Sequence, residues 1–246
     1  MLAIYKKEMH SYFTTVTGYI FLAVALVISS FVFSITTILA DEPTSDTSSY
    51  FSIILFLMII FLPILTMRSF SDERRTKTDQ LILTSPNSIF SIVIGKFLGA
   101  FTMFIIYLAL SCLNFIILFL PTFTPDGASG PNVAMLIGNL IALILVGMCF
   151  IAIGIFISTL TENMFASAVL TVGALFGLLV INGIGNLLNA DSLYAVRYII
   201  DWLSIFSRFD AFVYGYFDIS ALIYYISVTG IFLFLSERVF QARRLS

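Results

Sequence analysis

The chain has 246 residues, of which 60% are hydrophobic and only 11% charged, with a formal net charge of -2. A soluble domain carries about 25% charged residues, so this chain has too little polar surface to cover a soluble core, and we expect an integral membrane protein. Its single histidine excludes a metal site built from several histidines of one chain, and its charge gives no reason to expect a nucleic-acid partner.

The first predicted element is an amphipathic helix over residues 1–16. Its large apolar side chains recur at helical spacing and therefore share one face: Leu2, Tyr5, Met9, Tyr12, Phe13 and Val16. Lys6, Lys7, Glu8 and His10 fall elsewhere on the helix. A helix with an aromatic-rich face and a basic flank lies in the plane of the membrane interface. The alternative is an ordinary frayed N-terminus.

Apolar segments long enough to cross the bilayer follow, since a helical span needs about 20 residues. They are residues 18–40, 50–67, 91–120, 133–160, 164–188 and 219–236. The predicted fold class is therefore an all-α integral membrane protein, with one domain over residues 1–246. Lys96, near the start of the third span, is expected to extend to the interface. Asn114, Asn139 and Asn182 are expected to hold helices together.

A dense charged segment separates the second span from the third. Seven charged residues lie within it: Arg68, Asp72, Glu73, Arg74, Arg75, Lys77 and Asp79. With the N-terminus inside, ten of the 12 Lys and Arg residues fall on one side of the membrane. Lys and Arg accumulate in cytoplasmic loops, so we expect both termini and this segment to be cytoplasmic.

Residues 191–217 are too interrupted to span a membrane and too apolar to form a free loop. At helical spacing their polar side chains form one narrow stripe: Arg197, Asp201, Ser204 and Arg208. We expect one or two interfacial or re-entrant helices on the outer face, with Arg197 and Asp201 paired one turn apart.

The motifs of several enzyme classes are missing. The glycine that opens a P-loop is absent before Gly95-Lys96, and neither a zinc-protease nor a serine-hydrolase motif occurs. No acidic residue lies at the centre of a span, which disfavours ion-coupled transport and intramembrane proteolysis. A membrane domain with a charged cytoplasmic segment and no nucleotide site suggests a partner that supplies energy.

Specific stretches of the sequence resemble one family. They are L-P-I-L-T-M-R-S-F-S-D-E-R-R-T-K-T-D-Q-L-I-L-T-S-P from Leu62, L-T-E-N-M from Leu160, R-F-D-A-F-V-Y-G-Y-F-D-I-S from Arg208 and the end F-L-F-L-S-E-R-V-F-Q-A-R-R. They resemble the ABC-2 type transporter permeases, and within these the gliding-motility and copper-nitrous-oxide-cluster types. Lys77 stands where such permeases have Gly, and Gln80 where they have an acidic residue.

The resemblance implies a half-transporter. Two permeases, identical or divergent, would pair, and each would dock on a separate ATPase subunit that binds ATP and magnesium. No cofactor is expected in this chain. A cytoplasmic coupling helix around Asp72–Leu83 would sit in a groove of the ATPase. The residues implied in coupling are Arg68, Asp72, Glu73, Arg74, Arg75, Thr78, Gln80, Leu81 and Leu83, with a second cytoplasmic contact at Thr161, Glu162 and Asn163.

The expected function is export of a hydrophobic or amphipathic substrate across a bacterial cytoplasmic membrane. One alternative is a non-transporting membrane anchor or assembly subunit that uses the same ATPase docking for mechanical work. A further alternative is an intramembrane enzyme. The sequence shows no set of acid, base or metal-binding residues that such an enzyme would need.

Overall fold

The computed structural model describes residues 2–39, 47–77, 88–119, 133–187, 204–209, 212 and 218–245. Within these residues the regular structure is helical and includes no strand. Six helical segments are long and apolar enough to cross a membrane. The predicted all-α membrane fold with six spans is therefore confirmed.

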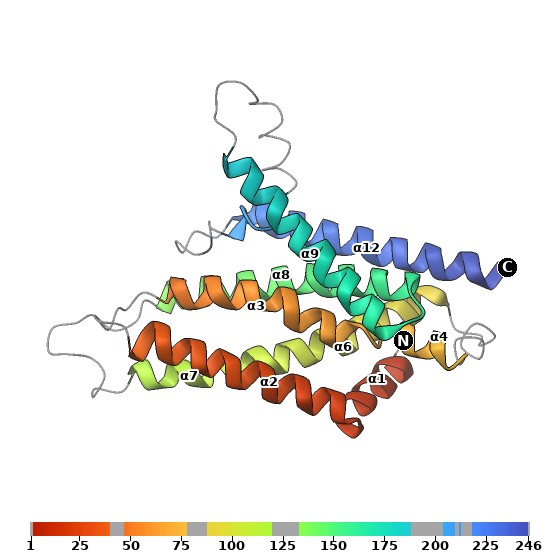
Figure 1. Ribbon diagram of the computed structural model, residues 1–246, viewed down its shortest axis with the longest axis horizontal. Helices are drawn as coiled ribbons and strands as arrows, with labels where there is room; N and C mark the ends of the chain where they lie inside the picture. Colours follow the sequence, from red (N-terminus) through yellow and green to blue (C-terminus); the bar gives the residue numbers. More distant parts are fainter. Residues whose placement is uncertain are drawn as a thin grey trace, which may run out of the picture.

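The helices follow the chain from a short N-terminal element to a long C-terminal one (Figure 1). The N-terminal half comprises α1 (Leu2–Thr14), α2 (Val16–Phe33) with the π-helical turn η1 (Ser34–Ile38), α3 (Ser48–Thr66) and α4 (Ser71–Arg75). The rest comprises α6 (Ile89–Ser111), α7 (Leu113–Ile116) with the 3-10 turn η2 (Ile117–Phe119), α8 (Val133–Leu160), α9 (Met164–Leu187) and α12 (Ile219–Leu245).

Helix α8 is the centre of the bundle. It carries no charged residue and packs against α3, α6, α9 and α12. Two glycines allow this close packing: a Cβ at Gly147 would lie 2.2 Å from the ring of Phe104, and one at Gly154 would lie 2.2 Å from the hydroxyl oxygen of Thr66. Helix axes approach closely where side chains are this small.

We expect Gly147→Val to destabilise the bundle by about 1–3 kcal/mol, because the added carbons overpack a filled contact between α8 and α6. The measurement is the midpoint of thermal unfolding in detergent. Gly173→Val in α9 is the matched control, since a Cβ there meets no atom within 4 Å. Equal unfolding midpoints for the two variants would contradict this account of the core.

Both termini, α1 and α4 lie at the same end of the bundle (Figure 1). The last helix continues beyond the expected end at Ser236 and includes the basic tail as far as Leu245. There the guanidinium of Arg238 lies 4.8 Å from the ring centre of Phe234. A side chain of this length can cover apolar surface while its charge stays in water. Arg238 can therefore lie on a helix that leaves the membrane.

The described part of residues 191–217 packs against the bundle. Ile205, Phe206 and Phe209 are buried, and the hydroxyl of Tyr225 in α12 donates to the carbonyl of Ile205 at 2.8 Å. Of the polar stripe, Ser204 accepts a hydrogen bond from Asn182 at 2.6 Å. Arg208 lies over the ring of Tyr224. Arg197 and Asp201 lie outside the described residues, so the re-entrant helices remain a prediction.

The asparagines act in different ways. Asn114 donates to Ser30 at 3.2 Å and so joins α7 to α2, and the bond from Asn182 to Ser204 fastens the 204–209 segment to α9. The bond of Asn114 agrees with the expected role of holding helices together, whereas the bond of Asn182 joins a helix to the turn that begins at Ser204. Asn139 in α8 is buried, and its amide makes no hydrogen bond within the described part of the chain.

Candidate functional site

The turn from α3 into α4 is anchored on the end of α8. The backbone amides of Phe70 and Ser71 donate to the hydroxyl oxygen of Ser158 at 3.1 and 3.2 Å. The side chains of Ser71 and Ser158 are fully buried. Ser158 therefore satisfies two amides at the start of a helix, which have no partner within that helix. The short helix α4 is fixed to the central helix of the bundle by buried hydrogen bonds.

A second connection joins the charged segment to the turn between α8 and α9. The guanidinium of Arg74 lies 2.5 Å from the carboxylate of Glu162 and donates to the carbonyl of Leu160 at 3.1 Å. The hydroxyls of Ser71 and Thr161 are 3.1 Å apart. The structure thus brings together the two segments that the sequence suggested separately. We call residues 71–77 and 161–163 the coupling platform, after the role in coupling that the resemblance implies for these segments.

Asn163 has a structural place within this platform. Its side-chain oxygen accepts a hydrogen bond from the backbone amide of Phe165 at 2.9 Å. An asparagine in this position caps the N-terminus of a helix, here α9. Asn163 therefore fixes where α9 begins, next to the ion pair of Glu162.

On the other side of α4, a buried cation joins three helices. The ammonium of Lys96 in α6 lies 3.0 Å from a carboxylate oxygen of Glu8 in α1 and 3.0 Å from one of Glu73 in α4. It also donates to the carbonyl of Ser69. Its side chain is only 2% exposed, so the expectation that Lys96 extends to the interface is wrong. Two carboxylates inside the fold pair with this ammonium, which would otherwise be a buried charge without compensation.

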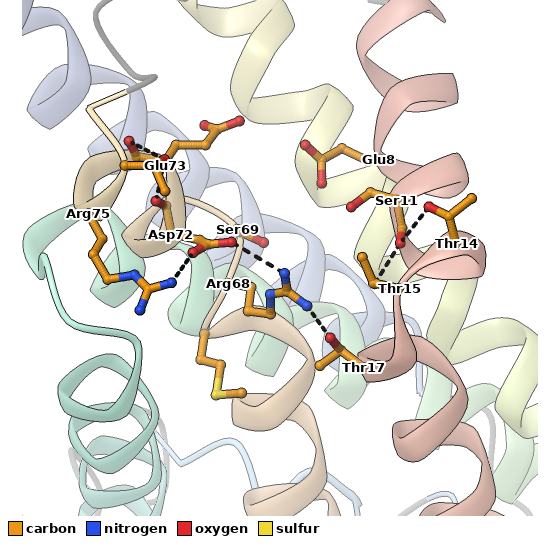
Figure 2. A network of polar contacts seen from close by, with 12 residues as sticks. Glu8, Ser11, Thr14, Thr15, Thr17, Arg68, Ser69, Asp72, Glu73 and Arg75 are labelled. Atoms are coloured by element: carbon orange, nitrogen blue, oxygen red, sulfur yellow. Dashed lines mark hydrogen bonds and ion pairs between the residues drawn. The ribbon is translucent and has the colours of Figure 1, made fainter.

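Arg68 links the same region to α2. Its guanidinium donates to the hydroxyl of Thr17 and lies 3.3 Å from Asp72, which is also 3.3 Å from Arg75 (Figure 2). A polar cleft of about 190 Å³ lies between α1, the end of α3 and α4, and Arg68 and Asp72 are among the side chains that line it. Arg68 and Asp72 are thus fixed by contacts within the fold, and both side chains also remain partly exposed to the cleft.

The side chains of α4 divide into an inner and an outer set. Glu73 and Arg74 are 14% and 16% exposed, because they point toward Lys96 and Glu162. Arg75 is 62% exposed, and Thr76 and Lys77 are exposed as well. The outer face of the platform therefore consists of exposed residues: Arg75, Thr76, Lys77, Asn163 and Glu162, the last of them 75% exposed. Thr78, Gln80, Leu81 and Leu83 lie outside the described residues.

The backbone at Lys77 explains why glycine suits this position. Lys77 has a φ of 56°, in the left-handed region that a residue without Cβ enters most easily. It directly follows Thr76, the C-cap of α4, and its amide donates to the carbonyl of Arg74 at 3.1 Å. Helices commonly end with such a left-handed glycine. The Gly that the resemblance suggests for this position would fit such a helix end.

Sequence reasoning missed Glu8, Lys96, Ser158 and Thr17 as members of the site. Two of them carried a signal: Lys96 is a single charge in an otherwise apolar span, and Glu8 is the one acid of the first helix. An isolated charge in an apolar segment needs a partner. Among the described residues, no group of His, Cys, Asp or Glu is suited to hold a metal ion.

Comparisons with known proteins agree with this architecture. The family model described as ABC-2 family transporter protein matches residues 3–243, which is nearly the whole chain. The search of curated proteins found no significant match to this chain. With six apolar helices and a match over this length, the chain belongs to the ABC-2 transporter family and is a transmembrane permease subunit of an ABC transporter.

Proposed function

We propose that this permease exports a hydrophobic or amphipathic substrate, driven by a separate ATPase that docks on the coupling platform. ATP and magnesium bind in that partner, and the chain itself has no catalytic role. A pair of ATPase subunits and a second permease, identical or divergent, complete the transporter. The substrate pathway forms between the two permeases.

The observation that carries the proposal is the attachment of α4 to α8. The turn before α4 is bound through Ser158, and Arg74 of α4 reaches Glu162 beyond the end of the same helix. Buried hydrogen bonds in a satisfied network are rigid. A displacement of α4 by a docked ATPase therefore moves α8, which contacts four other spans.

The proposed location is a bacterial cytoplasmic membrane with both termini in the cytoplasm. The end of the bundle that holds α1 and α4 carries most of the described basic side chains: Lys6, Lys7, Arg68, Arg74, Arg75, Lys77, Lys96 and Arg238. An excess of Lys and Arg marks the cytoplasmic side. The platform then faces the compartment that contains ATP.

Cysteine labelling tests this orientation. In a background without Cys112 and Cys149, a cysteine at Ser48 or Ser129 should react with an impermeant maleimide in intact cells. A cysteine at Thr78 or Ser246 should react only after permeabilisation. Labelling of Thr78 from outside would reverse the topology and place the platform away from ATP.

The proposed function is tested by purifying the permease in mild detergent, identifying the co-eluting chains and reconstituting the complex in liposomes. We expect an ATPase with a P-loop to co-elute, and ATP to drive transfer of lipid, peptide or small apolar molecules. An intact complex that hydrolyses ATP but moves none of these would favour the membrane-anchor role instead.

A further inference from the structure

Lys96, Glu8 and Glu73 form a cluster of charged side chains that is largely shielded from water, which is rare in proteins. Lys96 is 2% exposed, and the side chains of Glu8 and Glu73 are 12% and 14% exposed. Charges removed from water are stable only when paired and hydrogen-bonded. Each of the three groups comes from a different helix, so the pairing defines how α1, α4 and α6 sit together.

Polar contacts add to the apolar packing that holds helix α1, whose apolar side chains lie against the core but stay partly exposed. None of its residues is fully buried. It comes close to α6 at Gly99, where a Cβ would lie 2.9 Å from the Cβ of Glu8. Tyr12 adds a hydrogen bond to the carbonyl of Leu65 at 3.2 Å. Glycine at position 99 brings the backbone of α1 near enough for Glu8 to reach Lys96.

Helix α4 is bound to the same ammonium through Glu73. Lys7 also pairs with Glu73 at 3.3 Å, but Lys7 is 64% exposed, and exposed ion pairs contribute little. The buried Lys96 is therefore the principal connection between α1 and α4. Moving one helix without the other would leave a carboxylate or the ammonium unpaired in a buried site, which is strongly unfavourable.

We propose that Lys96 is a positioning residue that makes α1 move together with α4. When the ATPase displaces α4, the ion pairs of Lys96 carry that displacement to α1 at the membrane surface. Lys96 itself touches neither the ATPase nor the substrate. This inference rests on the proposed function, because the docked ATPase is what displaces α4.

Hydrogen–deuterium exchange on the purified complex in nanodiscs, with and without a non-hydrolysable ATP analogue, tests the inference. In the wild type, the analogue should alter exchange in peptides from both α1 and α4. Glu8→Gln keeps the pair of Lys96 with Glu73 but removes the carboxylate of α1. In this variant the response of α4 should persist and that of α1 should be lost. Without nucleotide, its α1 amides should exchange about tenfold faster than in the wild type.

Lys6→Met is the matched control, because it neutralises an exposed charge on the same helix and should respond as the wild type does. Lys96→Met should release both helices, and Glu8→Gln carries the test if that variant does not fold. A normal response of α1 in Glu8→Gln overturns the inference, as does a wild type in which α4 responds and α1 does not. A wild type in which neither helix responds overturns both the inference and ATPase coupling.

Discussion

Arg75→Glu is expected to weaken binding of the ATPase by at least about tenfold while the permease inserts and folds normally. Arg75 is 62% exposed on the outer face of α4, so reversing its charge changes the docking surface rather than the core. A like charge placed against a complementary partner costs several kcal/mol, and tenfold in affinity corresponds to about 1.4 kcal/mol. The measurement is the dissociation constant of the purified complex, by surface binding or fluorescence.

Arg238→Glu is the matched control for this experiment. It makes the same charge change on an exposed arginine of α12, toward the same end of the bundle but outside the platform. Its ATPase affinity should stay within about twofold of the wild type, as for a peripheral charge. Equal losses in both variants would mean that net charge alone attracts the ATPase, and the platform would lose its assignment.

Ser158→Ala is expected to separate ATPase binding from movement of the membrane helices. The substitution leaves the amides of Phe70 and Ser71 buried without their acceptor, and each such group costs about 1–3 kcal/mol. The outer face of α4 is untouched, so the ATPase should still bind. The response of α8 to the ATP analogue, measured by hydrogen exchange, should be lost or strongly reduced.

Ser236→Ala controls for the loss of a buried hydroxyl. Ser236 is also fully buried, but its hydroxyl donates to the carbonyl of Phe232 in its own helix at 2.7 Å. Removing it leaves no amide without an acceptor. An unchanged response of α8 in Ser158→Ala, or the same loss in Ser236→Ala, would contradict the anchoring role of Ser158.

The membrane fold was predictable because its signal is local. Each span is a run of apolar residues whose length alone matches a bilayer, and no distant contact is needed to find it. The charged segment after α3 was equally visible, since seven charges between two apolar runs belong in water. What these patterns predict is the presence of elements and not the partners of individual side chains.

The partners in the site could not be predicted, because they come from distant parts of the chain. Lys96 and Glu8 are 88 positions apart, as are Arg74 and Glu162. A serine within an apolar span, such as Ser158, carries no sign that it accepts bonds from another helix. The direction of the Glu73 side chain, toward Lys96, also depends on this packing. The resemblance implies that Glu73 takes part in coupling, but it does not indicate this partner.

Site-specific photo-cross-linking tests the docking of the ATPase on the coupling platform most directly. A photoreactive amino acid is placed at Lys77 or Glu162, both exposed on the platform, or at Val133, which is 50% exposed at the other end of α8. We expect the Lys77 and Glu162 positions to cross-link to the co-purified ATPase, and the Val133 position not to. An intact complex that cross-links from Val133, or from neither platform position, would contradict it.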